Sequence, residues 1–259
     1  ITFVRQAIFC DDSTIVIGGS VDFDTVFENK KMMVLRVDTL GNLITFKNYG
    51  FANSIDYFSQ ITQTYDKGFS ICGSTEFGHP LDYGYNIIFK LDSSGNQQWY
   101  RKWGRNDADN GCISILNLFD STLLVSSRRP TQADVWPVNN RISNLQKITY
   151  NNTLVWDQDY GTIQNNYYDY LTGISVDMQL SDSTILCIRH RTQAYYPIFL
   201  LINNNGETIW EREHRILIYG SHLYTRATFV PADNGFVFSG LFQPCFGWGA
   251  SGRQDIFVI

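Results

Sequence analysis

Acidic residues are the first candidates for chemistry in this chain, but their spacing matches no established site. The stretch RNDADNG contains Asp107, Asp109 and Gly111. An EF-hand calcium loop requires the spacing D-x-D-x-D-G, which these residues do not match. Asp109 instead matches Asp56 and Asp169, each of which comes shortly before an expected strand. We therefore interpret Asp109 as a turn or strand-start residue rather than a calcium ligand.

The other residue types that could do chemistry are scattered. His190, His214 and His222 lie in or beside one stretch of the chain without a pair of carboxylates. No Walker loop, Rossmann fingerprint, H-E-x-x-H or G-x-S-x-G motif is present. Paired carboxylates for glycoside hydrolysis would have to face each other across a channel, which a sequence does not show. We accordingly predict no catalytic residue, no metal site and no cofactor.

The composition indicates a folded chain without a nucleic-acid or membrane partner. The 259 residues include 17% charged and 15% aromatic side chains, with a formal net charge of -5 and a pI near 5.3. This charge lacks the basic footprint of a nucleic-acid-binding protein. The longest aliphatic and aromatic run, Ile198 to Ile202, is too short to span a bilayer. We expect no nucleic-acid binding and no direct membrane insertion.

The cysteines form no C-x-x-C pair. Cys72 and Cys187 lie inside apolar runs, where a buried thiol acts as a small hydrophobic residue. A disulfide between Cys10 and Cys245 stays open as an alternative, because it requires the two ends of the chain to meet.

Two series of turn residues repeat along the chain. In the first series an Asp precedes a short apolar run; its members are Asp12, Asp66, Asp120, Asp182 and Asp233, spaced 54, 54, 62 and 51 residues apart. In the second series a turn residue divides two strand-like runs; its members are Gly41, Gly95, Asn152 and Gly206, spaced 54, 57 and 54 residues apart. Two anchor sets with the same period indicate tandem structural repeats.

Each repeat contains four short strand-like runs. The turns between them are rich in Asp, Asn and Gly, which tolerate the positive φ angles of tight hairpins. No segment shows a sustained helical period with caps. Repeated four-stranded antiparallel units are typical of a β-propeller. We expect an all-β fold, with one β-propeller domain or fragment over residues 1–259 and blades at approximately 1–50, 51–104, 105–161, 162–215 and 216–259.

The last of these five blades is expected to be incomplete. The final DIFVI at 255–259 lacks the turn and outer strand that follow the equivalent run in other units. We therefore favour a fragment of a larger propeller of six to eight blades. Trp99, Trp156 and Trp210 occupy one position of the outer strand, which the first unit fills with Thr45. A position that recurs in this way indicates packing between blades rather than ligand binding.

The pattern D-x-G-y-[IV]-[IV]-x-G-[ST], followed by [KR]-[LIV]-D-x-x-G-N-x-x-W-x-x-x-[YW]-G, resembles secreted and surface β-propeller repeat proteins of Bacteroidetes. Residues 66–104 match it best, and the other units match less closely across essentially the whole chain. The resemblance implies a modular exported or cell-surface protein, often one with a type IX secretion signal, but no particular activity. Asn152 replaces the turn Gly of the third unit, and Arg189 stands where other units have Gly or Ser.

The segments that do not repeat are the expected loops between second and third strands and between blades, which lie on one face of a propeller. Loops on a rigid scaffold are where binding function concentrates, and Tyr, Trp and Arg are common anchors of protein interfaces. The alternative is that these aromatic residues only fold the long loops down. The candidate binding residues are Tyr83, Tyr85, Arg128, Arg129, Trp136, Arg189, Arg191, Tyr195, Tyr196 and Trp248.

These observations favour a non-catalytic interaction or scaffold propeller of a secreted or cell-surface protein, which binds a protein partner through its variable loop face. Two alternatives come from other classes. A carbohydrate-binding adhesin predicts exposed aromatic residues such as Trp136 and Trp248. A propeller hydrolase or lyase predicts carboxylates or histidines that converge at one mouth of the channel.

Overall fold

The computed structural model describes residues 2–23, 29–77, 84–104, 111–130, 141–160, 171–191, 198–213, 221–232, 235–244 and 255–258. Over these ranges the chain forms strands and turns, without a helix that could cross a membrane. The strands make five antiparallel sheets in chain order, four of four strands and the last of three. This arrangement confirms the expected all-β propeller with an incomplete last blade.

Blade 1 contains β1 (Thr2–Phe9), β2 (Ile15–Asp22), β3 (Lys30–Val37) and β4 (Leu43–Tyr49). Blade 2 contains β5 (Ser54–Gln63), β6 (Phe69–Phe77), β7 (Tyr85–Leu91) and β8 (Gln97–Trp103). Blade 3 contains β9 (Gly111–Asn117), β10 (Thr122–Pro130), β11 (Arg141–Thr149) and β12 (Leu154–Tyr160). Blade 4 contains β13 (Leu171–Ser181), β14 (Thr184–Arg191), β15 (Ile198–Asn203) and β16 (Thr208–Glu213). Blade 5 contains β17 (Ser221–Ala232), β18 (Gly235–Pro244) and β19 (Asp255–Val258).

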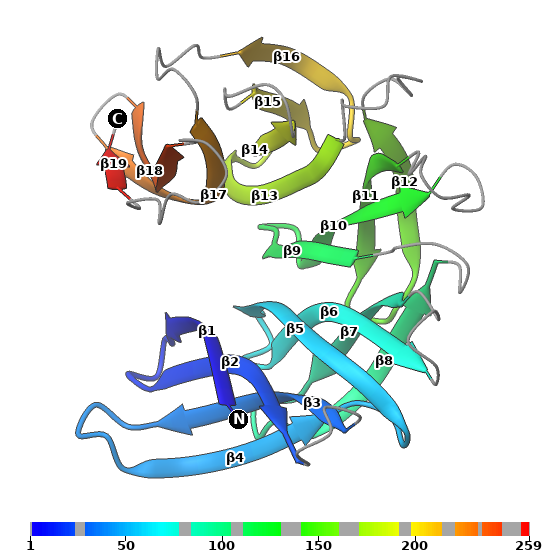
Figure 1. Ribbon diagram of the computed structural model, residues 1–259, viewed down its shortest axis with the longest axis vertical. Helices are drawn as coiled ribbons and strands as arrows, with labels where there is room; N and C mark the ends of the chain where they lie inside the picture. Colours follow the sequence, from blue (N-terminus) through cyan, green and yellow to red (C-terminus); the bar gives the residue numbers. More distant parts are fainter. Residues whose placement is uncertain are drawn as a thin grey trace.

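The five sheets follow one another around an arc (Figure 1). The first strand of each sheet lies toward the inside of the arc, and β4, β8, β12 and β16 lie outside. Within each blade the strands pair in sequence order, so that every connection is a hairpin. One end of each blade therefore carries the turns between first and second strands, and the opposite end carries the loops between second and third strands.

The turn before each outer strand needs a left-handed residue. Gly41, Gly95 and Gly206 have φ angles of 85°, 77° and 83°, and Asn152 has a φ of 64° at the same position of blade 3. Asn tolerates this region better than other residues with a side chain. The N–H of Asn152 bonds to the carbonyl of Thr149 at 3.0 Å, so the departure from Gly leaves the turn intact.

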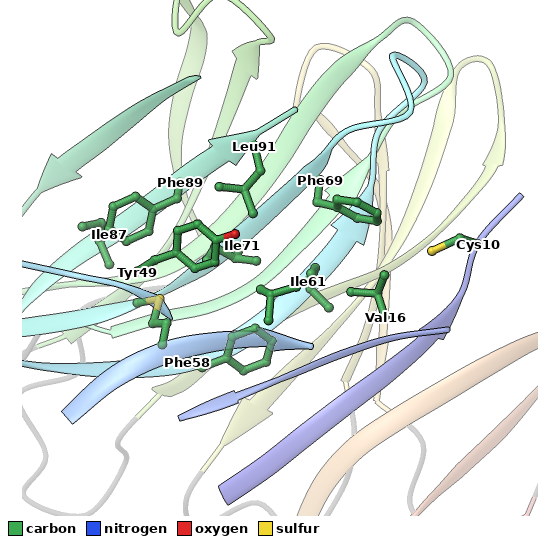
Figure 2. Close-up of a cluster of buried hydrophobic side chains, with 12 residues drawn as sticks. Cys10, Val16, Tyr49, Phe58, Ile61, Phe69, Ile71, Ile87, Phe89 and Leu91 are labelled. Atoms are coloured by element: carbon green, nitrogen blue, oxygen red, sulfur yellow. The ribbon is translucent and has the colours of Figure 1, made fainter. Parts of the chain in front are cut away.

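The hydrophobic core lies between neighbouring blades rather than within one sheet. Figure 2 shows the cluster between blades 1 and 2, in which Val16 of β2 faces Phe58 and Ile61 of β5. These side chains are almost fully buried. A Cβ atom on Gly18 would lie 2.2 Å from the Phe58 ring, so the close approach of the two sheets requires glycine there.

The recurring tryptophans join each outer strand to the next blade. The indole N–H of Trp99 donates to the carbonyl of Tyr150 at 2.6 Å, and that of Trp156 donates to the carbonyl of Asn204 at 3.0 Å. Both carbonyls belong to the turn before the outer strand of the following blade. The expected packing role of Trp99 and Trp156 is therefore confirmed.

A second repeating contact joins the inner strands. The amide oxygen of Gln6 accepts the backbone N–H of Ile61 at 2.8 Å, and the oxygen of Gln60 accepts the N–H of Ile115 at 2.9 Å. Gln6 and Gln60 are one repeat of 54 residues apart, and both follow a β-bulge in their own strand. Because β5 and β9 are edge strands of their sheets, the neighbouring blade satisfies backbone N–H groups that the sheet does not use.

Candidate functional site

Four of the candidate binding residues have described side chains, and these are Tyr85, Arg128, Arg129 and Arg189. Tyr85 begins β7, where its ring packs edge-on against Phe77 at 6.3 Å between centroids. The Lys102 ammonium lies 4.4 Å from the centre of the Tyr85 ring. Tyr85 is thus part of a packed aromatic cluster on blade 2.

The candidate arginines belong to two blades, with Arg128 and Arg129 on β10 and Arg189 and Arg191 on β14. Arg129 pairs with Asp157 and Asp159 of β12, with a distance of 3.2 Å to Asp159. Arg189 pairs with Glu211 of β16 at 2.6 Å. Arg128 is half-buried at the end of β10. Each charged partner belongs to the outer strand of the same blade, so Arg129 and Arg189 brace their own sheets.

Several candidate residues lie outside the described residues. Tyr83, Trp136, Tyr195, Tyr196 and Trp248 fall there, and their role in binding stays a prediction. Arg191 ends β14, but its side chain is not described. Asp109 and Asp169 also lie outside the described ranges.

A buried carboxylate marks the loop-bearing end of blades 1 and 2. Asp22 ends β2 and is directly opposite Lys30, which begins β3. The Asp22 side chain is fully buried, and its Oδ1 lies 3.5 Å from the Lys30 ammonium. Neither oxygen of Asp22 accepts a hydrogen bond from the described residues. Most buried carboxylate oxygens in folded proteins are hydrogen-bonded, so Asp22 is a candidate functional residue.

Lys30 also contacts aromatic rings on the inner strands of blades 1 and 2. Its ammonium lies 4.8 Å from the centre of the Tyr57 ring on β5 and 5.4 Å from that of Phe3 on β1. Both contacts are in the range of cation–π attraction. Phe3 is 49% exposed although it lies on an inner strand. The ion pair therefore lies at the seam between the first strands of two blades, beside an exposed aromatic ring.

Tyr57 connects the pair to a second carboxylate. Burial raises the pKa of the Tyr57 hydroxyl, and the negative charges of Glu76 and Asp22 raise it further. Glu76 lies near the end of β6 and is half-buried. Asp22 and Glu76 are 54 residues apart and occupy the same position in successive blades. We call Asp22, Lys30, Tyr57 and Glu76 the Asp22 cluster.

A separate latch next to the cluster is structural. The Lys31 ammonium donates to the carbonyls of Phe51 and Ser54 at 2.6 and 2.7 Å, and to Oδ2 of Asp56 at 3.1 Å. The hydroxyl of Ser54 donates to the same oxygen of Asp56 at 2.6 Å. Asp56 therefore organises the start of β5 and ties it to blade 1. The structure supports the strand-start interpretation for this residue.

The opposite end of the blades carries ion pairs that repeat. Asp66 contacts Lys90 at 2.7 Å and Asp120 contacts Lys147 at 2.6 Å, and Asp12 pairs with Arg36 in the same way. A depression of ≈ 230 Å³ lies beside the last pair, lined by Asp11, Asp12, Arg36, Gln63, Lys67 and Ser93. Because the same ion pair recurs within each of three successive blades, we assign this end to architecture.

The sequence analysis missed the whole Asp22 cluster. The sequence did contain one indication of the cluster. The first and second units have an acidic residue at or near the end of the second strand, whereas the third unit has Pro130 and the fourth has Thr192 at that position. Tyr57 and Lys30 carry no such signal. They reach the carboxylates because two blades pack side by side, and a linear pattern does not record that contact.

Comparison with known proteins gives similarity at the level of the fold. No protein-family model matches the chain, and no curated protein matches it. Among solved structures, an α-L-arabinanase of Penicillium chrysogenum in complex with arabinobiose has a TM-score of 0.64 at 10% identity, and covers 93% of this chain and 77% of its own. The α-L-arabinofuranosidase Arb93A of Fusarium graminearum has a TM-score of 0.64 at 11% identity, with coverages of 93% and 76%.

The chain spans only 34% of a third solved structure, a puromycin hydrolase, with a TM-score of 0.45 at 14% identity. The two matches at a TM-score of 0.64 support the β-propeller.

These two neighbours also overturn the prediction of a non-catalytic interaction module and the prediction that the chain is not an enzyme. Both of these structures are named as arabinose-releasing enzymes, an α-L-arabinanase and an α-L-arabinofuranosidase. The earlier predictions relied on the lack of a catalytic sequence motif. A propeller assembles a site from residues of different blades, which lie too far apart in the sequence to form such a motif.

Proposed function

We propose that this chain is a glycoside hydrolase whose site is the Asp22 cluster at the loop-bearing end of blades 1 and 2. The observation that carries the proposal is the buried Asp22 carboxylate, which has a cation beside it and no hydrogen bond from the described residues. Hydrolysis of a glycosidic bond commonly requires two carboxylates that act on opposite sides of the bond. Asp22 and Glu76 supply two such groups, and both act electrostatically on the Tyr57 hydroxyl.

The two carboxylates have different surroundings, which favours different roles. Asp22 is fully buried beside Lys30, and the ammonium supplies the positive charge that a buried carboxylate needs. We assign Asp22 the role of the charged group, either nucleophile or base. Glu76 is half-buried and is assigned the role of the proton donor to the leaving oxygen. Tyr57 is assigned the role of a neutral hydrogen-bond donor, since its pKa is raised.

The substrate class follows from the surroundings and from the neighbours. Phe3 is an exposed aromatic ring beside Lys30, and such a ring offers an apolar face to a sugar. An arabinanase and an arabinofuranosidase share the fold, so arabinose-containing glycans are the first class to test. The proposal keeps an exported or cell-surface location for the chain.

The test is sugar release from a defined glycan panel. Purified chain is incubated with linear arabinan, arabinobiose, arabinoxylan and a β-glucan, and the products are separated by anion-exchange chromatography. The proposal predicts release of arabinose or arabino-oligosaccharides by the wild-type chain and loss of that release in Asp22→Asn. Asp182→Asn, on an exposed turn of blade 4, is the control. Binding of a glycan without any cleavage would overturn the proposal.

A further inference from the structure

Two buried thiols from neighbouring blades meet in one apolar cluster. Cys72 is the fourth residue of β6 and Cys112 is the second residue of β9. Both are free and at least 97% buried. They pack with Ile88, Ile115 and other apolar side chains between blades 2 and 3. Neither thiol has a part in the Asp22 cluster.

Strand alternation in β6 turns the Cys72 side chain toward blade 3. In β6, Ile71 packs into the cluster shared with blade 1, while Cys72 packs into the cluster shared with blade 3. Cys112 lies against the same stretch of β6, because its side chain interacts with both the Cys72 thiol and the backbone N–H of Gly73. Burial raises the pKa of the Cys112 thiol well above its ordinary value, and the neighbouring Cys72 raises it further.

The other described thiols lie in different clusters. Cys10 packs in the cluster between blades 1 and 2, and Cys187 packs in the cluster between blades 3 and 4. Of the four thiols in the described part of the chain, Cys72 and Cys112 are the two that share a cluster. Cys245, the earlier candidate partner of Cys10, lies outside the described residues.

We propose that Cys72 and Cys112 close a disulfide that joins blade 2 to blade 3 under oxidising conditions. With glutathione disulfide as the oxidant, one cysteine thiolate attacks a glutathione sulfur and releases one glutathione thiol. The second cysteine thiolate then displaces the other glutathione and forms the Cys72–Cys112 bond. Two protons leave the cysteines and two glutathione thiols form, so the two electrons lost by the protein reduce the oxidant.

The bond forms while the interface is open and persists once it closes. A thiol with a raised pKa is a poor nucleophile in the folded chain, and both thiols are shielded from solvent. Oxidation is therefore expected during folding or local opening. The closed link would tie residues 40 positions apart in the sequence. A loop of that length predicts a rise in Tm of roughly 5 to 8 °C for a chain of this size.

The experiment maps the bond directly in the unmodified chain. The chain is unfolded, then refolded in parallel with a glutathione redox buffer or with excess dithiothreitol. Free thiols are then blocked with iodoacetamide in denaturant, so that buried thiols also react. Non-reducing peptide mapping by mass spectrometry is expected to find a peptide pair linked through Cys72 and Cys112 in the oxidised sample only. Thermal denaturation of the same samples is expected to show the higher Tm in the oxidised one.

Two variants separate this link from a general effect of oxidation. Cys72→Ala combined with Cys112→Ala is expected to remove the Tm difference between the two buffers, whereas Cys187→Ala is expected to keep it. The peptide map is made on the wild-type chain, so it tests the proposal even if a variant folds poorly. Complete alkylation of Cys72 and Cys112 after oxidative refolding would overturn the proposal, as would a linked peptide that joins either of them to another cysteine.

Discussion

The Asp22 carboxylate lies fully buried 3.5 Å from the Lys30 ammonium, where β2 ends and β3 begins. The two residues face each other across the hairpin, and the loop between them is one of the variable segments of the chain. Lys30 in turn lies over rings from the inner strands of both blade 1 and blade 2. The pair therefore lies both at the loop-bearing end of blade 1 and at the interface between blades 1 and 2. Residues at such a position can differ between blades without disturbing the repeat.

Removal of Lys30 should cost more stability than removal of an exposed lysine. Lys30→Met leaves the Asp22 charge buried without compensation, and we expect the free energy of unfolding to fall by about 3 kcal/mol. Lys67→Met is the matched control, because Lys67 pairs with Asp11 at 2.7 Å but both side chains are more than 60% exposed. The control should cost much less, because solvent screens an exposed ion pair. Urea denaturation at pH 7 measures both changes in the free energy of unfolding. Equal changes would show that the buried Asp22–Lys30 pair contributes no more than an exposed ion pair.

Trp99 should contribute to stability through both packing and its indole N–H. Trp99→Leu removes the ring from the interface between blades 2 and 3 and leaves the Tyr150 carbonyl without its donor. We expect a loss of about 3 kcal/mol. Trp99→Phe keeps a ring but loses the donor, and should cost about 1 kcal/mol less than the leucine variant. The order of the two variants in thermal denaturation is the readout, and the reverse order would contradict a packing role.

Acid should destabilise the chain through the repeating ion pairs. Burial acts to raise the pKa of Asp66, but hydrogen bonds from Lys90 and Thr64 outweigh it and hold the pKa below its ordinary value of 3.8. A carboxyl group whose pKa is lowered by folding contributes stability above its unfolded pKa, and loses it as the pH falls through the folded value.

Asp66→Asn should therefore lower stability at pH 7 and flatten the decline of Tm with pH between about 5 and 2. Asp120, whose pKa is also lowered, should behave in the same way. Asp182→Asn provides the baseline, because this residue is exposed and has no basic residue at the matching position of β15, where Leu201 stands. A wild-type slope in Asp66→Asn would show that the ion pair does not couple to folding.

Gly73 should be required for the position of Tyr57 in the candidate site. A Cβ atom at this position would lie 1.9 Å from the backbone carbonyl of Tyr57, and a backbone atom cannot move aside cheaply. Gly73→Ala should shift β5, lower the free energy of unfolding by about 2 kcal/mol and reduce any hydrolase activity. Gly111→Ala is the control, because no atom lies within 4 Å of its added Cβ. Unchanged activity in Gly73→Ala would separate β5 from the site.

The architecture was readable from the sequence because every blade repeats the same local chemistry. The turn Asp and Gly residues and the outer-strand tryptophans recur with nearly one period, so each occurrence supports the others. Asn152 could be accepted in place of Gly because both residues enter the left-handed region. The Cys72–Cys112 neighbourhood was not readable, because it depends on which face of two different strands meets at a blade interface.

The site was not readable for a related reason. A repeat shows what blades have in common, whereas a site uses what one or two blades do differently. Asp22 and Glu76 share a position in the first two units. The third and fourth units have no acidic residue at that position, and this difference was the trace of the cluster in the sequence. The prediction of a non-catalytic module came from treating an absent motif as an absent activity.

The most direct measurement of the central claim is the turnover of an arabinose-containing glycan by the wild-type chain, Asp22→Asn, Glu76→Gln and Asp182→Asn, each shown to be folded by circular dichroism. The account predicts measurable kcat for the wild type, a loss of at least about 100-fold in both cluster variants, and wild-type kcat for Asp182→Asn. Equal turnover in all four proteins, or none in the wild type, would contradict it.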